Sequence, residues 1–405
     1  MKQLLWIGCL ESDEEFKMKA QKGYDLASAQ ISQKNILTGI EKITGMIFDS
    51  INGSVLPPFP IYADRKIDKI EWEHNLGSRD VSVGYLNDKY INRVNCKKAM
   101  LTESDVWYQE RYQGGEVDIF VYSMRSAPMA TAIKLKSKIP NSRVFLIITD
   151  LPQFMDLGQS RFKSLLKKVD GIEIKRLLPK FDGYILYAKT MAKFLGIESK
   201  RWMLMEGSYS ASENKMLGVQ TKRKAIMYSG KLDKEYGLEL LVDSFMEIND
   251  ENLELWLTGG GNAVDYIKEK ASIDHRIKFY GFLPKREDVL ILQQQAALLL
   301  NMRLPSEKSS NFCFPSKLFE YMVTGVPVLT FKIGGIPDEY YQYLYTIENE
   351  DKASLIHAIQ NTMNLEEKEL EDKGKQAKNY ILREKTSEAQ AKRIVEFVGL
   401  RRSTL

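Results

Sequence analysis

ALLLNMRLPSEKSSNFCFPSKLFEYMVTGVPVLTF, residues 297–331, contains a complete strand–helix–strand unit. The runs ALLLN (297–301) and PVLTF (327–331) are short and apolar, as buried strands are. Between them, Pro315 suits the first turn of a helix over residues 315–324, and Gly325 suits the position after its end. Strands that alternate with helices in this way predict a parallel sheet.

The same alternation runs along the chain in two groups. We expect strands at residues 3–8, 117–122, 144–149, 183–187 and 202–205, and again at 225–229, 253–257, 277–280, 297–301 and 327–331. Residues 207–224 are polar and lack apolar periodicity, as linkers do. The sequence therefore predicts an α/β protein with two doubly wound, Rossmann-like domains that face a central cleft. The predicted parts are an N-terminal domain (1–206), a linker (207–224), a C-terminal domain (225–385) and a last helix (386–405) that packs back on the N-terminal domain.

Composition narrows the class of protein. The 405 residues include 58 Lys and Arg against 54 Asp and Glu, a net charge of +4, so we expect no nucleic-acid partner. No apolar run reaches the roughly 18 residues of a transmembrane helix. The first residues turn acidic too soon for a signal peptide, and three cysteines are too few for a disulfide framework. We therefore expect a cytoplasmic protein.

Ligands of open α/β sheets bind beyond the carboxyl ends of the strands, so the loops there are the first candidates for a site. The helix after Pro315 would direct its first amides, at Ser316, Lys317 and Leu318, toward an anion. Glu320, one turn later, would accept hydrogen bonds from two ribose hydroxyls. The alternative is that Lys317 is solvated and Glu320 only complements the helix dipole.

Three further loops add to this pattern. Gly230 and Lys231 follow one predicted strand, Gly259 and Gly260 follow the next, and the turn at 281–284 offers backbone groups at Phe282 and Leu283 that would read a base edge. Glycines let a backbone approach a phosphate closely, and a lysine pairs with it. Each loop alone is equally consistent with a surface turn. Together they predict a site for a nucleoside diphosphate.

Four segments in order resemble the GT-B fold glycosyltransferases, specifically their family 4 of nucleotide-sugar-dependent enzymes. They are SGKLDKEYGLELLVDSF (229–245), LELWLTGGG (253–261), IKFYGFLP (277–284) and FPSKLFEYMVTGVPVLTFKIGGIPDE (314–339). The resemblance implies that the C-terminal domain binds the nucleotide sugar and the N-terminal domain binds the acceptor. It also implies that Glu320 holds the ribose, that Lys231 contacts the diphosphate with help from the amides of 316–318, and that Phe282 lies by the base.

The chain departs from the family pattern at two positions. Phe312 stands where the family usually has a second glutamate, eight residues before Glu320. Tyr236, beside Gly237, stands where a lysine is frequent, and Lys317 or Lys234 would compensate. These departures leave the stereochemical outcome open. They also keep open the alternative of a non-catalytic subunit that binds the acceptor or a partner enzyme.

The chemistry of such a transfer requires stabilisation of the leaving diphosphate. We expect Lys231, Lys317 and the helix N-terminus to stabilise the diphosphate without a metal ion or cofactor. Lys231, which contacts the diphosphate, and Glu320, which holds the ribose, are the predicted catalytic residues of the C-terminal domain. A general base would come from the N-terminal domain. Asp150, after the strand VFLIIT, is the first candidate and Glu11 the second. Either acid is equally suited to cap a helix.

Residues 161–180 (Arg161–Lys180) hold seven Lys or Arg residues and two acids, with apolar residues at helical spacing. Such a helix suits an anionic membrane surface, here the inner face of the cell membrane, with an ordinary surface helix as the alternative. The resemblance implies a glycosyltransferase that moves a hexose-type sugar from a UDP-sugar to a glycan in surface polysaccharide synthesis. A lipid-linked acceptor, such as a polyprenyl diphosphate, is one alternative. A nicotinamide oxidoreductase is disfavoured because the glycine fingerprint is incomplete.

Overall fold

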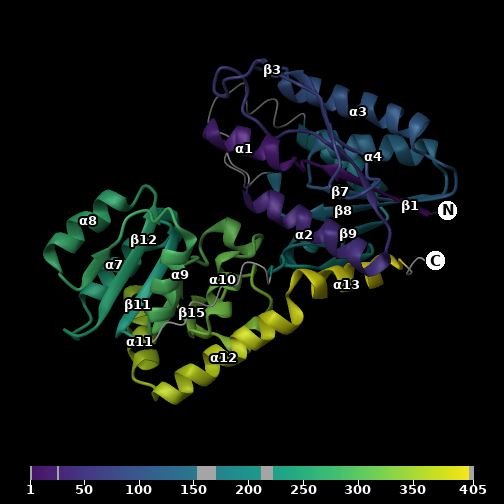
Figure 1. Ribbon diagram of the computed structural model, residues 1–405. Helices are drawn as coiled ribbons and strands as arrows, with labels where there is room; N and C mark the ends of the chain where they lie inside the picture. The colour runs from purple at the N-terminus through teal and green to yellow at the C-terminus, as the bar shows by residue number, and fades with distance from the viewer. Residues whose placement is uncertain (1, 25–26, 153–169, 211–221, 401–405) are drawn as a thin grey trace. The chain divides into compact units, whose positions relative to one another are not determined.

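The computed structural model describes residues 2–24, 27–152, 170–210 and 222–400. The chain divides into two compact units (Figure 1). Unit 1 comprises Met1–Tyr187, Met191–Ser208 and Ser387–Leu405, and unit 2 comprises Ala188–Thr190 and Tyr209–Thr386. The chain thus passes between the units near residues 208–209 and 386–387, where Tyr209 N–H donates to the Lys385 carbonyl at 2.8 Å.

Unit 1 is built on an eight-stranded sheet with the order β10-β9-β8-β7-β1-β2-β5-β4. Its strands are β1 (Lys2–Gly8), β2 (Phe48–Asn52), β4 (Ile70–Trp72), β5 (Asp80–Ser82), β7 (Glu116–Tyr122), β8 (Ser142–Ile148), β9 (Gly183–Leu186) and β10 (Trp202–Leu204). Every neighbouring pair is parallel except β4–β5 at the edge. A separate antiparallel ribbon pairs β3 (Lys66–Ile67) with β6 (Tyr85–Leu86).

Helices cover both faces of this sheet. Among them are α1 (Asp13–Gln21), α2 (Ala27–Thr44), α3 (Asn92–Glu110), α4 (Ser126–Lys138), α6 (Thr190–Phe194) and α13 (Ser387–Val398). Helices α3 and α4 pack together, and α2 packs against α13 on the other face (Figure 1). A side chain at Gly39 of α2 would lie 2.6 Å from the Ala391 Cβ, so the glycine allows these two helices to approach closely. The last helix of the chain therefore belongs to unit 1.

Unit 2 has a six-stranded, fully parallel sheet with the order β13-β12-β11-β14-β15-β16. Its strands are β11 (Ala225–Lys231), β12 (Glu254–Gly260), β13 (Ile277–Phe279), β14 (Leu298–Asn301), β15 (Val328–Phe331) and β16 (Tyr345–Ile347). In order of appearance this is the 3-2-1-4-5-6 arrangement of Rossmann sheets. The central strands of unit 1 follow the same rule, so the predicted α/β class with two doubly wound sheets is confirmed.

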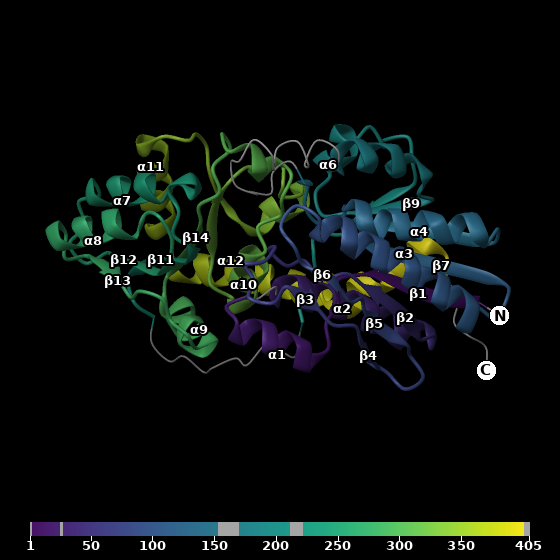
Figure 2. The same ribbon diagram turned by 90° about the horizontal axis from the view of Figure 1, so that it is seen from above.

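Within the described residues, six helices flank the sheet of unit 2. They are α7 (Leu238–Met246), α8 (Val264–Ile273), α9 (Arg286–Gln295), α10 (Lys317–Thr324), α11 (Lys352–Met363) and α12 (Glu367–Glu384). Helices α7, α8 and α11 cover one face, and α9, α10 and α12 cover the other (Figure 2). Helix α10 ends at Gly325, whose φ of 79° is left-handed, as the sequence predicted for that glycine. None of the helices in the described ranges is long and apolar enough to cross a membrane.

Unit 1 contains a buried charged cluster that couples its stability to pH. The imidazole of His74 lies between Asp80 (Nδ1 to Oδ2, 2.7 Å) and Glu41 (Nε2 to Oε1, 2.9 Å). Burial alone would lower the pKa of His74, but the hydrogen bonds to the two carboxylates outweigh it and raise the pKa from 6.5 to about 9. The stabilisation is therefore complete below pH 6.5 and is lost as the pH rises through 9.

We predict that His74→Gln lowers the melting temperature of unit 1 at pH 6 and that this difference shrinks by pH 10. Each kcal/mol corresponds to about 2–4 °C for a unit of this size. Thermal unfolding followed by circular dichroism across the pH range measures the effect. The matched control is His275→Gln, since that side chain is exposed. A melting difference independent of pH would show that the charged pairs do not stabilise the fold.

Candidate functional site

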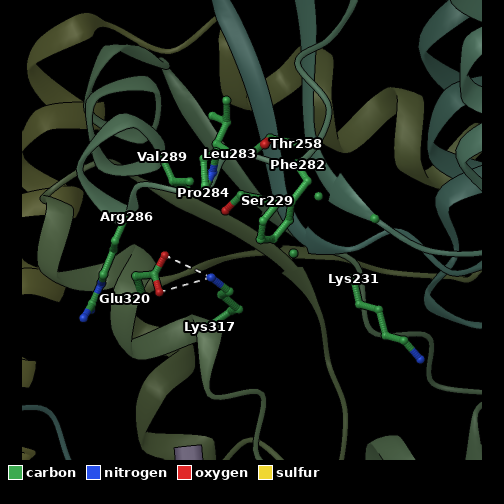
Figure 3. Close-up of a pocket in the computed structure, with 13 residues that line it drawn as sticks. Ser229, Lys231, Thr258, Phe282, Leu283, Pro284, Arg286, Val289, Lys317 and Glu320 are labelled. Atoms are coloured by element: carbon green, nitrogen blue, oxygen red, sulfur yellow. Dashed lines mark hydrogen bonds and ion pairs between the residues drawn. The ribbon is translucent and has the colours of Figure 1, made fainter. Parts of the chain in front are cut away.

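A cavity of about 560 Å³ opens at the carboxyl ends of β11 and β12, beside the first turns of α9 and α10 (Figure 3). It lies next to the point where the sheet order reverses, between β11 and β14, which is where open α/β sheets bind ligands. The residues that line it are Ser229, Gly230, Lys231, Thr258, Gly259, Gly260, Phe282, Leu283, Pro284, Arg286, Val289, Lys317 and Glu320. All of them belong to unit 2.

Eight of the ten predicted donor-binding residues line this cavity. They are Gly230, Lys231, Gly259, Gly260, Phe282, Leu283, Lys317 and Glu320. The two exceptions are Ser316, which is exposed outside it, and Leu318, which is fully buried in the core. The expected free amide at Leu318 was wrong, because that N–H donates to the Pro315 carbonyl at 2.8 Å within the first turn.

The floor of the cavity is bare backbone. Strands β11 and β12 stay in register to their ends, so Gly230 lies opposite Gly259. Both have left-handed φ values, 146° and 137°, and a Cβ at position 259 would lie 1.8 Å from the Gly230 carbonyl oxygen. Only glycine fits there. The close approach of β11 and β12 at these two glycines therefore leaves backbone without side chains, which a phosphate group can approach closely.

Glu320 is held in place on the wall of the cavity. Both of its carboxylate oxygens lie 3.2 Å from the Lys317 Nζ, one turn earlier on α10. Figure 3 shows this pair pointing into the cavity. A second donor, Gln293 Nε2 from α9, reaches Oε1 at 2.8 Å. The carboxylate thus has fixed partners on one side and faces the cavity with its remaining acceptor capacity.

Gln293 was missed by the sequence interpretation. Its side chain is fully buried, and the same Nε2 also donates to Ser229 Oγ at 2.8 Å. Ser229 is fixed in turn by the hydroxyl of Tyr321, which donates to its carbonyl at 2.8 Å and accepts from its N–H at 2.9 Å. This network links α9, β11 and α10 behind the cavity. It sets the position of the Glu320 carboxylate.

We predict that Gln293→Leu, which keeps a similar volume, weakens nucleotide binding about tenfold, because the loss of one hydrogen bond to a charged group costs roughly 1.5 kcal/mol. Isothermal titration calorimetry with UDP measures the effect. The control is Gln295→Leu on the same helix, because Gln295 does not line the cavity. Equal UDP affinity for both variants would show that the network does not position Glu320.

Lys231 lies at the rim of the cavity. Its ammonium pairs with Asp233, and this hydrogen bond raises the pKa of Lys231 above its ordinary value. Figure 3 shows the side chain directed away from Glu320 and Lys317. Asp233 also accepts from the Asn262 N–H at 2.9 Å, so the pair is anchored to the loop after β12. Lys231 is therefore charged at neutral pH but partly compensated by its neighbour.

The opposite end of the cavity is apolar and aromatic. The Phe282 side chain is 77% exposed, an unusual state for a large aromatic residue. Its loop is fixed because the Gly281 carbonyl accepts from Thr258 Oγ1 at 2.7 Å and from the Gly259 N–H at 2.9 Å. Arg286, at the start of α9, also lines the cavity, on the Glu320 side in Figure 3, and was not predicted. The sequence feature that could have predicted Arg286 as a site residue is its position at the start of the helix that follows the loop.

The structure shows the surroundings of Phe312 and Tyr236, the two residues that depart from the family pattern. Phe312 does not line the cavity, and Glu307 does not replace the missing carboxylate, since its side chain accepts from the Ser309 N–H at the start of a 3-10 turn. The ring of Tyr236 lies under the guanidinium of Arg303, at 4.2 Å from the ring centroid. Lys234 is paired with Glu239 at 2.8 Å.

The two candidate bases lie in unit 1. Asp150 is exposed, two residues after the end of β8, at the carboxyl edge of that sheet. Glu11 is only 4% exposed, and its Oε1 lies 2.6 Å from the Lys19 ammonium. Burial raises the pKa of Glu11. Ser12, not Glu11, caps α1 by accepting from the Glu15 N–H, so Glu11 is a buried ion-pair partner.

The basic segment 161–180 lies largely outside the described residues, including Arg161, Lys163, Lys167 and Lys168. Residues 170–177 are helical, and Ile174 and Leu177 are buried while Lys175 and Arg176 are exposed. This described part therefore has the pattern of a surface helix with Ile174 and Leu177 in the core, although Ile172 is 69% exposed. Membrane binding by the whole segment stays a prediction.

Comparison with known proteins agrees with this geometry. Residues 211–380 match the model of the family described as glycosyl transferases group 1. The matched residues lie within unit 2, which is therefore similar to this family. An uncharacterized glycosyltransferase of Methanocaldococcus jannaschii is 27% identical over 124 residues. That match spans 30% of this chain and 30% of the relative.

Solved structures extend the likeness of fold to the whole chain. Sucrose-phosphate synthase from Thermosynechococcus elongatus superposes with a TM-score of 0.60 at 14% identity, covering 98% of both chains. HepE of Anabaena, in complex with UDP, gives 0.63 at 12% identity and covers 98% of this chain and 99% of its own. The lipopolysaccharide outer core galactosyltransferase WaaB gives 0.64 at 11%, with the same coverage. The fold is that of the GT-B glycosyltransferases.

Proposed function

We propose that the protein is a glycosyltransferase whose donor is a nucleoside diphosphate sugar, with UDP as the nucleotide. The observation that carries this is the combination of Glu320 and Lys317 above the bare backbone of Gly230 and Gly259 in one cavity. The ribose hydroxyls donate to Glu320, the diphosphate lies over the glycines, and the base stacks by Phe282. A cavity of about 560 Å³ has the size of small-molecule and cofactor sites.

The residues of this cavity match the charge that develops during glycosyl transfer. When the bond between the sugar and the diphosphate breaks, negative charge grows on the leaving phosphate. Lys317 lies at the cavity wall and stabilises that charge there, and Lys231, at the rim, contributes once its side chain turns from Asp233 toward the phosphate. The transferred sugar is of the hexose type, and the cations perform this role without a metal ion.

The acceptor half of the proposal concerns unit 1. Asp150 is the proposed general base, because it is exposed at the carboxyl edge of the unit 1 sheet. The acceptor is a glycan, carried on a polyprenyl diphosphate, and the product is a surface polysaccharide made on the cytoplasmic side of the membrane. The UDP complex of HepE and the outer-core activity in the name of WaaB support this class of substrates.

A donor screen tests the proposal. Purified protein is incubated with UDP-glucose, UDP-galactose, UDP-N-acetylglucosamine or GDP-mannose and a polyprenyl-diphosphate-linked glycan, and nucleotide release is measured. We expect UDP release from one UDP-sugar that depends on the acceptor and is lost in Glu320→Ala. Release from GDP-mannose alone would contradict the UDP assignment.

The second candidate function is a donor-binding subunit without transfer activity. It is favoured by one observation, the apolar Phe312 at a position where the resemblance implies a carboxylate. For such a subunit, UDP binding would persist and Glu320→Ala would abolish it, but no donor would release nucleotide with any acceptor.

A further inference from the structure

Exposed apolar side chains lie on two segments of unit 1, residues 59–61 and 86–94, that a backbone hydrogen bond joins. The six are Phe59, Ile61, Leu86, Tyr90, Ile91 and Val94, of which Ile61 is the most exposed at 70%. Single exposed apolar residues are normal on a protein surface, but a contiguous group marks an interaction site. We call these six residues the apolar tip.

Hydrogen bonds hold the two loops of the apolar tip together. The Phe59 N–H donates to the carbonyl of Asn87 at 2.8 Å, and the Asn87 side chain, fully buried, donates to the Pro57 carbonyl at 3.0 Å. Asn95 Nδ2, in the first turn of α3, donates to the Leu86 carbonyl at 2.9 Å. Figure 1 shows β3, the partner of β6, at the beginning of α3. The tip is therefore a built surface of the fold.

Three of the basic residues on the segment 89–98 accompany the apolar tip. Lys89, Arg93 and Lys98 form no ion pair within the described part of the chain, and Lys89 Nζ lies 5.2 Å from the Tyr90 ring centroid. Val94 and Lys98 are one helical turn apart, on the same side of α3. Asp88, the one acid between residues 86 and 98, is already paired with Arg65 at 2.6 Å. Three free cations thus accompany the apolar side chains.

We infer that the apolar tip and its three cations dock unit 1 on an anionic membrane surface. Apolar side chains that enter the headgroup boundary, flanked by Lys and Arg, are the chemistry of peripheral membrane binding. A protein partner fits less well, because lysine is depleted at the centres of protein interfaces. The inference extends the proposed lipid-linked acceptor. It assigns the contact to residues 59–98 rather than to the predicted segment 161–180.

Sedimentation of the full chain with vesicles tests this, using phosphatidylcholine alone and with added phosphatidylglycerol. We expect binding to the anionic vesicles only. The variant Tyr90→Ser/Ile91→Ser/Val94→Ser and the variant Lys89→Glu/Arg93→Glu/Lys98→Glu both lose it. Each basic residue near such a surface contributes on the order of fivefold in partitioning, so the three together account for about 100-fold.

Matched controls separate this surface from general hydrophobicity and charge. Leu76→Ser/Ile31→Ser/Ile47→Ser removes exposed apolar residues elsewhere on unit 1, and Lys17→Glu/Lys193→Glu/Lys200→Glu changes the same charge. Both controls are expected to sediment like the wild type. Circular dichroism and UDP calorimetry of all variants establish that the fold and the unit 2 site are intact.

Three results would overturn the inference. In the first, the wild type does not sediment with anionic vesicles. In the second, the tip variants sediment as the wild type does, whereas Lys163→Glu/Lys167→Glu/Lys168→Glu loses sedimentation. The third is a tip variant that converts a dimer to a monomer in size-exclusion chromatography, with no vesicle binding by either form. UDP binding is measured separately, so failure of the membrane inference leaves the donor proposal standing.

Discussion

Gly259→Ala is expected to abolish detectable UDP binding and to destabilise unit 2 by about 3 kcal/mol, because an added methyl group meets backbone and the left-handed φ strains any other residue. The Cβ would lie 1.8 Å from the carbonyl oxygen of Gly230, which cannot withdraw without breaking the register of β11 and β12. Chemical denaturation and UDP calorimetry measure the two effects.

Gly260→Ala provides the matched control. This neighbour also lines the cavity, but a Cβ there has nothing within 4 Å and its backbone is not left-handed. We expect wild-type stability and UDP affinity within about threefold, since substitutions away from strain and packing change stability by roughly 0.5 kcal/mol or less. If Gly259→Ala matched Gly260→Ala in both measurements, the close crossing of the two strands would have no functional importance.

The second large effect concerns Glu320. Glu320→Gln keeps the shape of the side chain but removes the charge, and we expect it to weaken UDP binding about 100-fold, because hydrogen bonds to a charged group contribute roughly 1.5–3 kcal/mol each. Loss of the carboxylate also frees Lys317, its partner at 3.2 Å. The measurement is the dissociation constant for UDP by calorimetry, and Glu307→Gln, outside the cavity, is the control.

A double-mutant cycle with the ligand isolates the proposed contact. UDP and 2′,3′-dideoxy-UDP are titrated into the wild type and into Glu320→Gln. If Glu320 binds the ribose hydroxyls, the wild type prefers UDP and the variant does not distinguish the two ligands. Equal preference in both proteins would place the ribose elsewhere and leave Glu320 as a complement to the helix dipole.

Much of the architecture could be predicted because it follows apolar periodicity. All five strands expected in unit 2 are present, and β16 was the one missed. In unit 1, β2 escaped prediction because its sequence, FDSIN, is polar although all five residues are buried. Asp49 and Ser50 are satisfied by distant partners, among them the Trp107 indole N–H at 2.8 Å. Tertiary contacts of this kind leave no local pattern in the sequence.

The residues of the candidate site also fall into those that the sequence could predict and those that it could not. Glycines and charged residues at strand ends were predictable, because the topology of a parallel sheet brings those ends together. Gln293 was not, since it lies in the middle of a helical pattern and its partners are 27 and 64 residues away along the chain. The pairing of Lys231 with Asp233 was also unforeseen, although the two are only two residues apart.

The central claim is that unit 2 binds a nucleoside diphosphate in the cavity between β11, β12 and α10. Titration of UDP into the full chain in a calorimeter tests it most directly. We predict saturable heat with one site per chain, no detectable binding by Gly259→Ala, and an affinity about 100-fold weaker in Glu320→Gln. Absence of heat with UDP, GDP and their sugar conjugates, or equal heat in all three proteins, would contradict it.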